Sequence, residues 1–107
     1  MTDSKKAVAP PHGRFKLGSL TATPGALALL QRLGVLPLSL LLRHARGDFG
    51  ELGAEDLTRN EEAIAMGFRV FSAYSLVDVR DPSKVHRCWV ITEADRSVTT
   101  LLLPEEY

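Results

Sequence analysis

The sequence predicts an α+β fold, in which about three N-terminal helices pack on one face of a three-stranded antiparallel β-meander. Three observations predict it. Residues 24–66 place apolar side chains at helical spacing, whereas residues 69–103 alternate apolar and polar positions as strands do. The expected strands have short connections, which favour antiparallel neighbours. The helical and strand patterns do not alternate along the chain, so a parallel α/β sheet is not expected.

Composition limits the classes of function. The chain has 107 residues, enough for one compact domain. Its 13 Lys and Arg residues balance 13 Asp and Glu residues. A strongly acidic DNA mimic and a basic nucleic-acid coat are therefore both disfavoured. The lone cysteine, Cys88, allows no internal disulfide and no cysteine-based zinc site, so a reducing cytoplasm is the expected location.

The chain is expected to begin with a flexible basic arm over residues 1–18, followed by a single α+β domain over residues 19–107. Pro10, Pro11 and two glycines oppose regular structure in the arm. Its basic side chains allow either a frayed terminus or a contact with an acidic partner or nucleic acid. No apolar stretch has the length of a signal peptide or a membrane span, so no membrane contact is expected.

Two short helices are expected next. Thr23 and Pro24 form a typical helix start, with Thr as the N-cap and Pro at the first helical position. Gly34 is a natural residue to end this helix. Pro37 opens a second helix that is expected to end near His44, where the helix dipole favours cations.

A third helix is expected over residues 54–66, closed by Gly67. Asn60 shares the spacing of its inward apolar positions, with Asp56 on the same edge, so it should point inward and find hydrogen-bond partners. Two interpretations follow. Asn60 either fastens the loop at residues 47–50 or joins a polar site with His44 and Asp48.

Three strands follow, over about residues 69–77, 84–92 and 98–103, and Pro104 stops the last one. Residues 78–83, which include Asp81-Pro82, are expected to connect the first two. The bend before the last strand carries five polar residues, more than a turn needs: Thr92, Glu93, Asp95, Arg96 and Ser97.

One set of side chains suits metal-independent ribonuclease chemistry. That reaction needs a base for the 2′-hydroxyl, an acid for the leaving group and cations for the phosphate. His44 can serve as acid or base near neutral pH, and Arg43 and Arg96 can bind a phosphate. The predicted catalytic residues are His44, Asp48, Glu93, Arg96 and Thr100. The predicted binding residues are Arg43, Asn60, Thr92, Asp95 and Thr99. The same residues would equally form a structural salt-bridge network or a partner-binding surface.

Neither a metal nor a cofactor is expected. The three histidines lie in different elements without the close spacing of zinc ligands, and no glycine-rich phosphate loop occurs. Unpaired loop carboxylates such as Asp48 and Asp95 are a weak basis for a magnesium site. Cys88, in mid-strand, is expected in the core.

Several segments together resemble a family of small bacterial proteins carried on plasmids and other mobile elements. They are RHARGDFG at 43–50, Asp56, Asn60, WVITEADRSVTT at 89–100 and LLPEEY at 102–107. Members are labelled plasmid-related or type I restriction subunit. The resemblance covers about residues 17–107, and departs at Phe49, where Trp is expected, and in a longer connection before the second strand. It implies a mobile-element habitat. The restriction label does not fit 107 residues, which cannot house a methyltransferase domain.

Two hypotheses of function follow. The first is a toxin-type, metal-independent ribonuclease acting on RNA, because helices before a meander are similar to small bacterial ribonuclease folds such as RelE-like toxins and barnase. It predicts that the five catalytic residues converge in one cleft. The alternative is a non-enzymatic factor, anti-defence or regulatory, that binds a host or defence protein. It predicts that these residues are held in salt bridges, with an apolar patch elsewhere. A homodimer through an edge strand is compatible with either.

Overall fold

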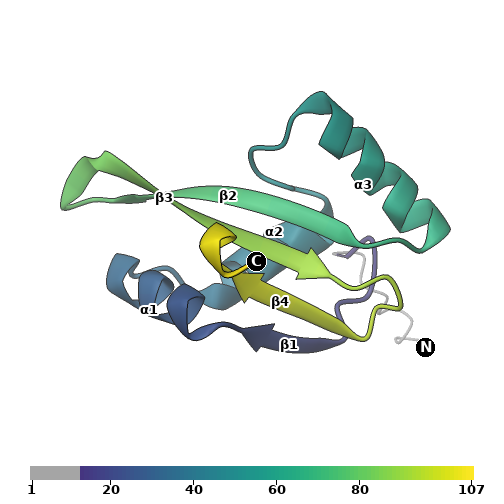
Figure 1. Ribbon diagram of the computed structural model, residues 1–107, viewed down its shortest axis with the longest axis horizontal. Helices are drawn as coiled ribbons and strands as arrows, with labels where there is room; N and C mark the ends of the chain where they lie inside the picture. The colour runs from purple at the N-terminus through teal and green to yellow at the C-terminus, as the bar shows by residue number, and fades with distance from the viewer. Residues whose placement is uncertain (1–12) are drawn as a thin grey trace, which may run out of the picture.

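The computed structural model describes residues 13–107. In it, three helices and a four-stranded sheet form an elongated molecule, with α2 behind the sheet and α3 beside it (Figure 1). The elements, in chain order, are β1 (Ser19–Ala22), α1 (Pro24–Leu33), α2 (Pro37–Arg46), α3 (Ala54–Met66), β2 (Val70–Asp78), β3 (Asp81–Thr92), β4 (Val98–Leu102) and the 3₁₀ turn η2 (Pro104–Glu106).

The sheet corrects the predicted fold class. The strands β2, β3 and β4 do form an antiparallel meander. However, β1 adds a fourth strand, parallel to β4, and the strand order is β1-β4-β3-β2. The fold is therefore α+β with a mixed sheet, and the prediction of a three-stranded, purely antiparallel sheet is wrong. The prediction missed β1 because four residues carry too short a pattern, and their partner lies at the far end of the chain.

The helix ends follow the local signals in the sequence. The Thr23 hydroxyl accepts a hydrogen bond from the Ala26 amide at 3.2 Å, which caps α1 at its start. Gly34 ends α1 in the left-handed region, at φ 71°. The bounds of α3 agree with the expected third helix, and α2 extends two residues beyond His44.

The main core lies between the sheet and the helices α1 and α2. Its buried members are Ala26, Leu30, Leu40, Leu41, Tyr74, Cys88, Val90 and Leu101. Cys88 is fully buried, as expected, and burial raises its pKa to about 11. A smaller cluster of Phe49, Ala63 and Val70 joins α3 to the same body. We call the opposite face of the sheet, which α1 and α2 leave uncovered, the outer face (Figure 1).

The β2–β3 hairpin projects beyond the body (Figure 1). A turn at residues 79–80 joins the two strands, so Asp81 and Pro82 belong to β3 and not to the connection predicted over residues 78–83. Pro82 lies where the register shifts between the Val77–Val85 pair and the next pair of strand residues. A regular ladder bond is not required at such a shift, so proline is tolerated there.

Part of the predicted arm packs against the body. The Arg14 amide donates to the Ala45 carbonyl at 2.6 Å, and its guanidinium pairs with Glu61 on α3 at 2.6 Å. The Leu17 carbonyl accepts a hydrogen bond from Thr99. Residues 13–18 are thus held by α2, α3 and β4. The prediction of a flexible basic arm otherwise falls on residues 1–12, which lie outside the described residues.

In residues 13–107, no single helix combines the length and apolar character needed to cross a membrane. Within the same described residues, α1 and α2 taken as a pair meet that standard of length and composition, and they are bent by 105° relative to each other.

Candidate functional site

His44 lies inside the molecule, on the face of α2 that also carries Leu40 and Leu41. None of its surface is exposed. Its Nδ1 is 2.6 Å from the Ser72 hydroxyl and its Nε2 is 2.9 Å from the Thr92 hydroxyl. Both ring nitrogens therefore have partners within the protein.

The hydrogen bonds of His44 continue as a chain across the sheet. Thr92 Oγ1 is 2.7 Å from Thr99 Oγ1, and Thr99 donates to the Leu17 carbonyl at 2.7 Å. A carbonyl only accepts and a hydroxyl has one proton, so Thr92 must donate to Thr99. His44 Nε2–H then donates to Thr92, and Nδ1 accepts from Ser72. The chain, which we call the buried relay, selects the Nε2–H tautomer.

Burial, together with the smaller effect of the positive charge of Arg96, lowers the pKa of His44 to about 4. His44 is therefore neutral at neutral pH, which agrees with an Nδ1 that accepts a hydrogen bond. Chemically, the relay can hold α2, β2, β3, β4 and the segment before β1 together. It offers no ring nitrogen to a molecule outside.

Asp48 is paired with Arg43 at the end of α2. Arg43 Nε lies 2.7 Å from Asp48 Oδ2, and its guanidinium lies 4.5 Å from the centre of the Tyr74 ring. The hydrogen bond from Arg43 keeps the pKa of Asp48 below its usual value. Tyr74 donates its hydroxyl to the Asp48 carbonyl at 2.6 Å. These contacts fasten the loop at residues 47–50.

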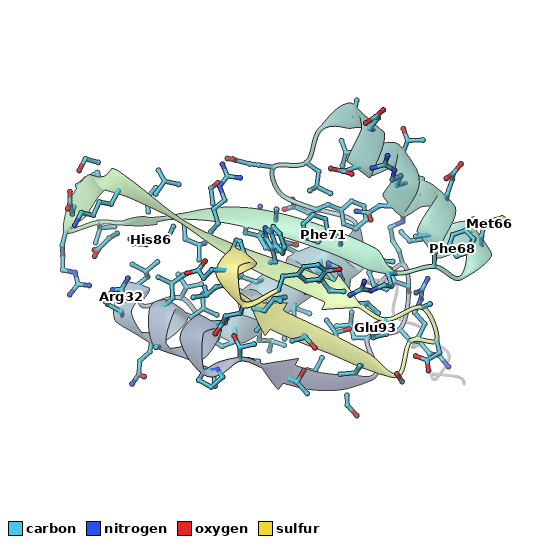
Figure 2. The ribbon with its side chains drawn as sticks, in the orientation of Figure 1. Arg32, Met66, Phe68, Phe71, His86 and Glu93 are labelled. Atoms are coloured by element: carbon cyan, nitrogen blue, oxygen red, sulfur yellow. The ribbon has the colours of Figure 1, made fainter. Side chains whose placement is uncertain are left out.

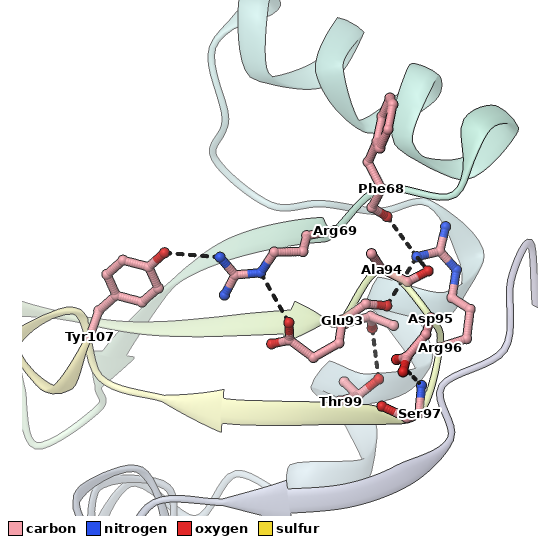
Figure 3. Close-up of polar contacts among 10 residues, drawn as sticks. Phe68, Arg69, Glu93, Ala94, Asp95, Arg96, Ser97, Thr99 and Tyr107 are labelled. Atoms are coloured by element: carbon pink, nitrogen blue, oxygen red, sulfur yellow. Dashed lines mark hydrogen bonds and ion pairs between the residues drawn. The ribbon is translucent and has the colours of Figure 1, made fainter.

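Arg96 fastens the bend between β3 and β4 to the end of α3. Its backbone is left-handed, at φ 61°, which is rare for a side chain of this size. Its Nη1 donates to the carbonyls of Phe68, Glu93 and Ala94 at 2.6, 3.2 and 3.3 Å, and its Nη2 donates to that of Ala63 at 2.9 Å. Figure 3 shows this clamp against the bend.

The remaining predicted residues have separate partners. Asp95 accepts a hydrogen bond from the Ser97 amide at 3.0 Å, within the bend. Thr100 lies 2.8 Å from the Thr21 hydroxyl. Asn60 faces inward, as its spacing predicted, but it bonds the backbone of Phe71 at 2.6 and 3.1 Å and not the loop at residues 47–50.

The sheet separates two groups of predicted residues. His44, Thr92 and Thr99 come together on the helix side. Because side chains alternate along a strand, the neighbours Glu93 and Thr100 point to the outer face. Asp48 is held by Arg43 at the end of α2. The structure thus brings three of these residues together, and it does not bring the five predicted catalytic residues into one cleft.

An aromatic cluster on the outer face was not among the predicted site residues. The ring centres of Phe71 and Trp89 are 5.0 Å apart, and those of Trp89 and Tyr107 are 5.7 Å apart. With Arg69 and Ile91, these three rings line a pocket of about 260 Å³. We call Phe71, Trp89 and Tyr107 the outer-face cluster. Along their strands, Phe71 and Trp89 alternate with residues that face the core. This alternation is the sequence signal that could have placed both rings on the outer face.

Arg69 lies at the edge of this pocket and forms an ion pair with Glu93. Its Nε is 3.3 Å from Glu93 Oε1, and its Nη1 donates to the Tyr107 hydroxyl at 3.1 Å. Figure 3 shows Arg69 between these two side chains. The hydrogen bond to Tyr107 and the charge of Glu93 both raise the pKa of Arg69. Glu93 therefore partly neutralises the one cation in the pocket lining.

Within the described range, no group of three His, Cys, Asp or Glu side chains is placed to hold a metal ion. Comparison with protein-family models, with curated proteins and with solved structures found no match.

Proposed function

We propose that this chain is a non-enzymatic factor that binds a partner protein through its outer face. The observation that carries the proposal is the outer-face cluster, which places Phe71, Trp89 and Tyr107 around one pocket beside Arg69. Trp, Tyr and Arg are the residues that dominate binding energy at protein interfaces. Tyr107 is 71% exposed and is the most accessible of the three aromatic side chains.

The charges around the cluster favour a protein over a nucleic acid. Nucleic-acid affinity rests on Lys and Arg side chains that neutralise phosphates. Arg69 is paired with Glu93, and Arg87 lies 4.0 Å from Glu51. The whole chain has no net charge at neutral pH. An apolar anchor side chain of a partner protein suits this pocket better than a phosphate does.

The position of His44 also favours this alternative over the metal-independent ribonuclease. A catalytic acid or base must reach the substrate, and both nitrogens of His44 bond internal hydroxyls. The pairs Arg43–Asp48 and Arg69–Glu93 fit the salt-bridge network that the second hypothesis expects. Ribonuclease activity stays a prediction that RNA cleavage tests.

The biological setting belongs to the same proposal and rests on the sequence alone. The resemblance to plasmid and mobile-element proteins suggests an accessory role in bacteria, with a host or defence protein as the partner. The single cysteine suggests a cytoplasmic location.

The test is site-specific photo-crosslinking in bacterial cells. A benzophenone amino acid replaces Tyr107 in one variant and Val79, 87% exposed at the hairpin tip, in a matched control. We expect a discrete adduct from position 107 and none from position 79. Trp89→Ala, introduced into the position 107 variant, should abolish the adduct, with folding checked by far-ultraviolet circular dichroism and thermal unfolding.

Equal adducts from both positions, or none from position 107, would contradict the proposal. Cleavage of labelled RNA by the wild-type protein in EDTA, lost in His44→Ala and Arg96→Ala, would establish the ribonuclease instead.

A further inference from the structure

A second binding site is suggested by the unequal lengths of β3 and β4. The last residue pair between them is Trp89 with Leu102, whereas β3 begins at Asp81. Residues 85–88 of β3 therefore pair with β2 on one side and with no described strand on the other. After Leu102, η2 turns the chain out of the line of β4 (Figure 1).

The backbone groups at this open edge are oriented for strand pairing. The Glu93 amide donates to the Val98 carbonyl of β4. Backbone N–H and C=O groups alternate sides along a strand, so those of Val85 and Arg87 point to the same side as those of Glu93. That side is vacant beyond the end of β4. The β2 edge of the same sheet is different, because Asn60 and the Phe49–Glu51 segment bond it.

A hollow of about 470 Å³ lies beside this edge, between α1, residues 85–87 of β3 and residues 103–105. We call it the β3 slot. The lining residues include three basic ones, Arg32, His86 and Arg87, and one acidic one, Glu105. Figure 2 shows Arg32 and His86 at the end of the molecule from which the hairpin projects.

Arg32, on the α1 side of the slot, is open to a ligand. No ion pair joins Arg32 to another residue of the described chain, and its carbonyl accepts a hydrogen bond from Arg80 at 2.9 Å. The side chain of Arg87 lies on the other face of β3, 4.0 Å from Glu51, so Arg32 and His86 are the basic side chains on the α1 side of the slot.

We propose that the β3 slot binds an extended acidic segment of a partner protein, which adds to the sheet as a strand beside Val85–Arg87. The segment continues the line of β4 antiparallel to β3, and the carboxylates on its α1 side lie near Arg32 and His86. A peptide fits better than a nucleic acid because the edge offers both N–H donors and C=O acceptors, which only another backbone matches in sequence. The site is separate from the outer-face cluster, so either proposal can fail without the other.

The test uses fluorescein-labelled, N-acetylated octapeptides that alternate Glu with Thr, and a control series with Lys in place of Glu. Fluorescence anisotropy measures affinity, and ¹⁵N-edited NMR locates the contact on the wild-type protein. We expect binding of the Glu peptide only, with the largest amide shifts at Val85 and Arg87. Arg32→Glu should weaken binding at least tenfold, whereas Arg59→Glu on α3, the matched charge reversal, and Tyr107→Ala should leave it unchanged.

A backbone-methylated peptide separates strand pairing from simple charge attraction. Methylation of alternate peptide nitrogens keeps every carboxylate but removes the donors that an added strand needs. We expect this peptide to lose binding. Equal binding of the methylated peptide would overturn the proposal, as would absence of binding by the Glu peptide. Tighter binding of oligouridylate at the same amides would also overturn it, in favour of a nucleic-acid site.

Discussion

At the scale of the residue, His44 shows how position changes the chemistry of a side chain. It carries no charge at neutral pH, because the buried relay gives each ring nitrogen one hydroxyl partner and burial disfavours the imidazolium. The free energy of unfolding should therefore depend on pH through this group. An unfolded histidine binds a proton near pH 6.5, whereas folded His44 does so only near pH 4.

We predict that acid destabilises the fold over the pH range between the unfolded and the folded pKa of His44. Between pH 6.5 and 4 the unfolded chain binds one more proton than the folded chain, so the free energy of unfolding falls as pH falls, by roughly 3 kcal/mol at most. The contribution is fully present above pH 6.5. Urea unfolding at successive pH values measures this slope.

The comparison variant is His44→Gln, which should be less stable at pH 7 but should lose most of the slope between pH 6.5 and 4.5. A slope unchanged in His44→Gln would show that other groups cause the acid destabilisation.

The burial of His44 could have been predicted from the sequence. It follows Leu40 by four residues and Leu41 by three, which is the spacing of one helix face. The prediction relied instead on the position of His44 near the end of α2, where the helix dipole favours cations. Its hydroxyl partners were not predictable, because Ser72 and Thr92 lie on strands whose register is a tertiary property.

At the scale of the element, Arg96 joins the β3–β4 bend to α3. Its guanidinium bonds the carbonyls of Ala63 and Phe68, at the end of that helix. The Ala63 carbonyl also accepts hydrogen bonds from the Gly67 and Phe68 amides, so the guanidinium adds to the bonds that end α3, at a position where the helix dipole favours a cation.

We predict that Arg96→Asn loosens the end of α3. Asn tolerates the left-handed backbone of Arg96 but lacks its guanidinium, so the change isolates the clamp from backbone strain. We expect a loss of about 1–3 kcal/mol in the free energy of unfolding. Hydrogen exchange should become faster at residues 63–69 while the amides of α1 stay protected. Unchanged exchange at residues 63–69 would show that the guanidinium contributes little to holding the helix.

Element boundaries were predictable where a single residue marks them. Thr23, Gly34 and Gly67 act through their own backbone or through a neighbour three or four residues away. The strand β1 has no such marker, and its pairing with β4 depends on the whole fold. For the same reason, the sequence identified Trp89 as a strand residue but not as part of a cluster with Tyr107, whose position depends on η2.

At the scale of the whole molecule, the sheet ends on one side in an unprotected edge. The strand β1 has no charged or proline residue, and its outer edge pairs with no described strand. Leu20 is 51% exposed, and it lines a hollow of about 430 Å³ together with Leu17, Leu42 and Ala45. Such edges favour pairing between chains.

We predict that two copies associate by antiparallel pairing of β1 about a twofold axis. Leu20→Lys should give a monomer in sedimentation velocity, because a lysine on an edge strand opposes pairing. Leu36→Lys, at a position that is 74% exposed on the α1–α2 connection, should remain dimeric. A wild-type protein that stays monomeric up to its solubility limit would contradict the prediction.

The pairing of β1 with β4 also determines when the molecule can fold during its synthesis. A ribosome makes residues 19–22 early, yet their partners are residues 98–101. Until those partners emerge, the nascent chain has helices with exposed leucines and an unfinished sheet, which are the features that chaperones recognise. Contacts between such distant segments also slow folding. We therefore expect the fold to close only after residues 98–102 leave the exit tunnel, and a translation-arrested chain ending before residue 98 to remain sensitive to protease.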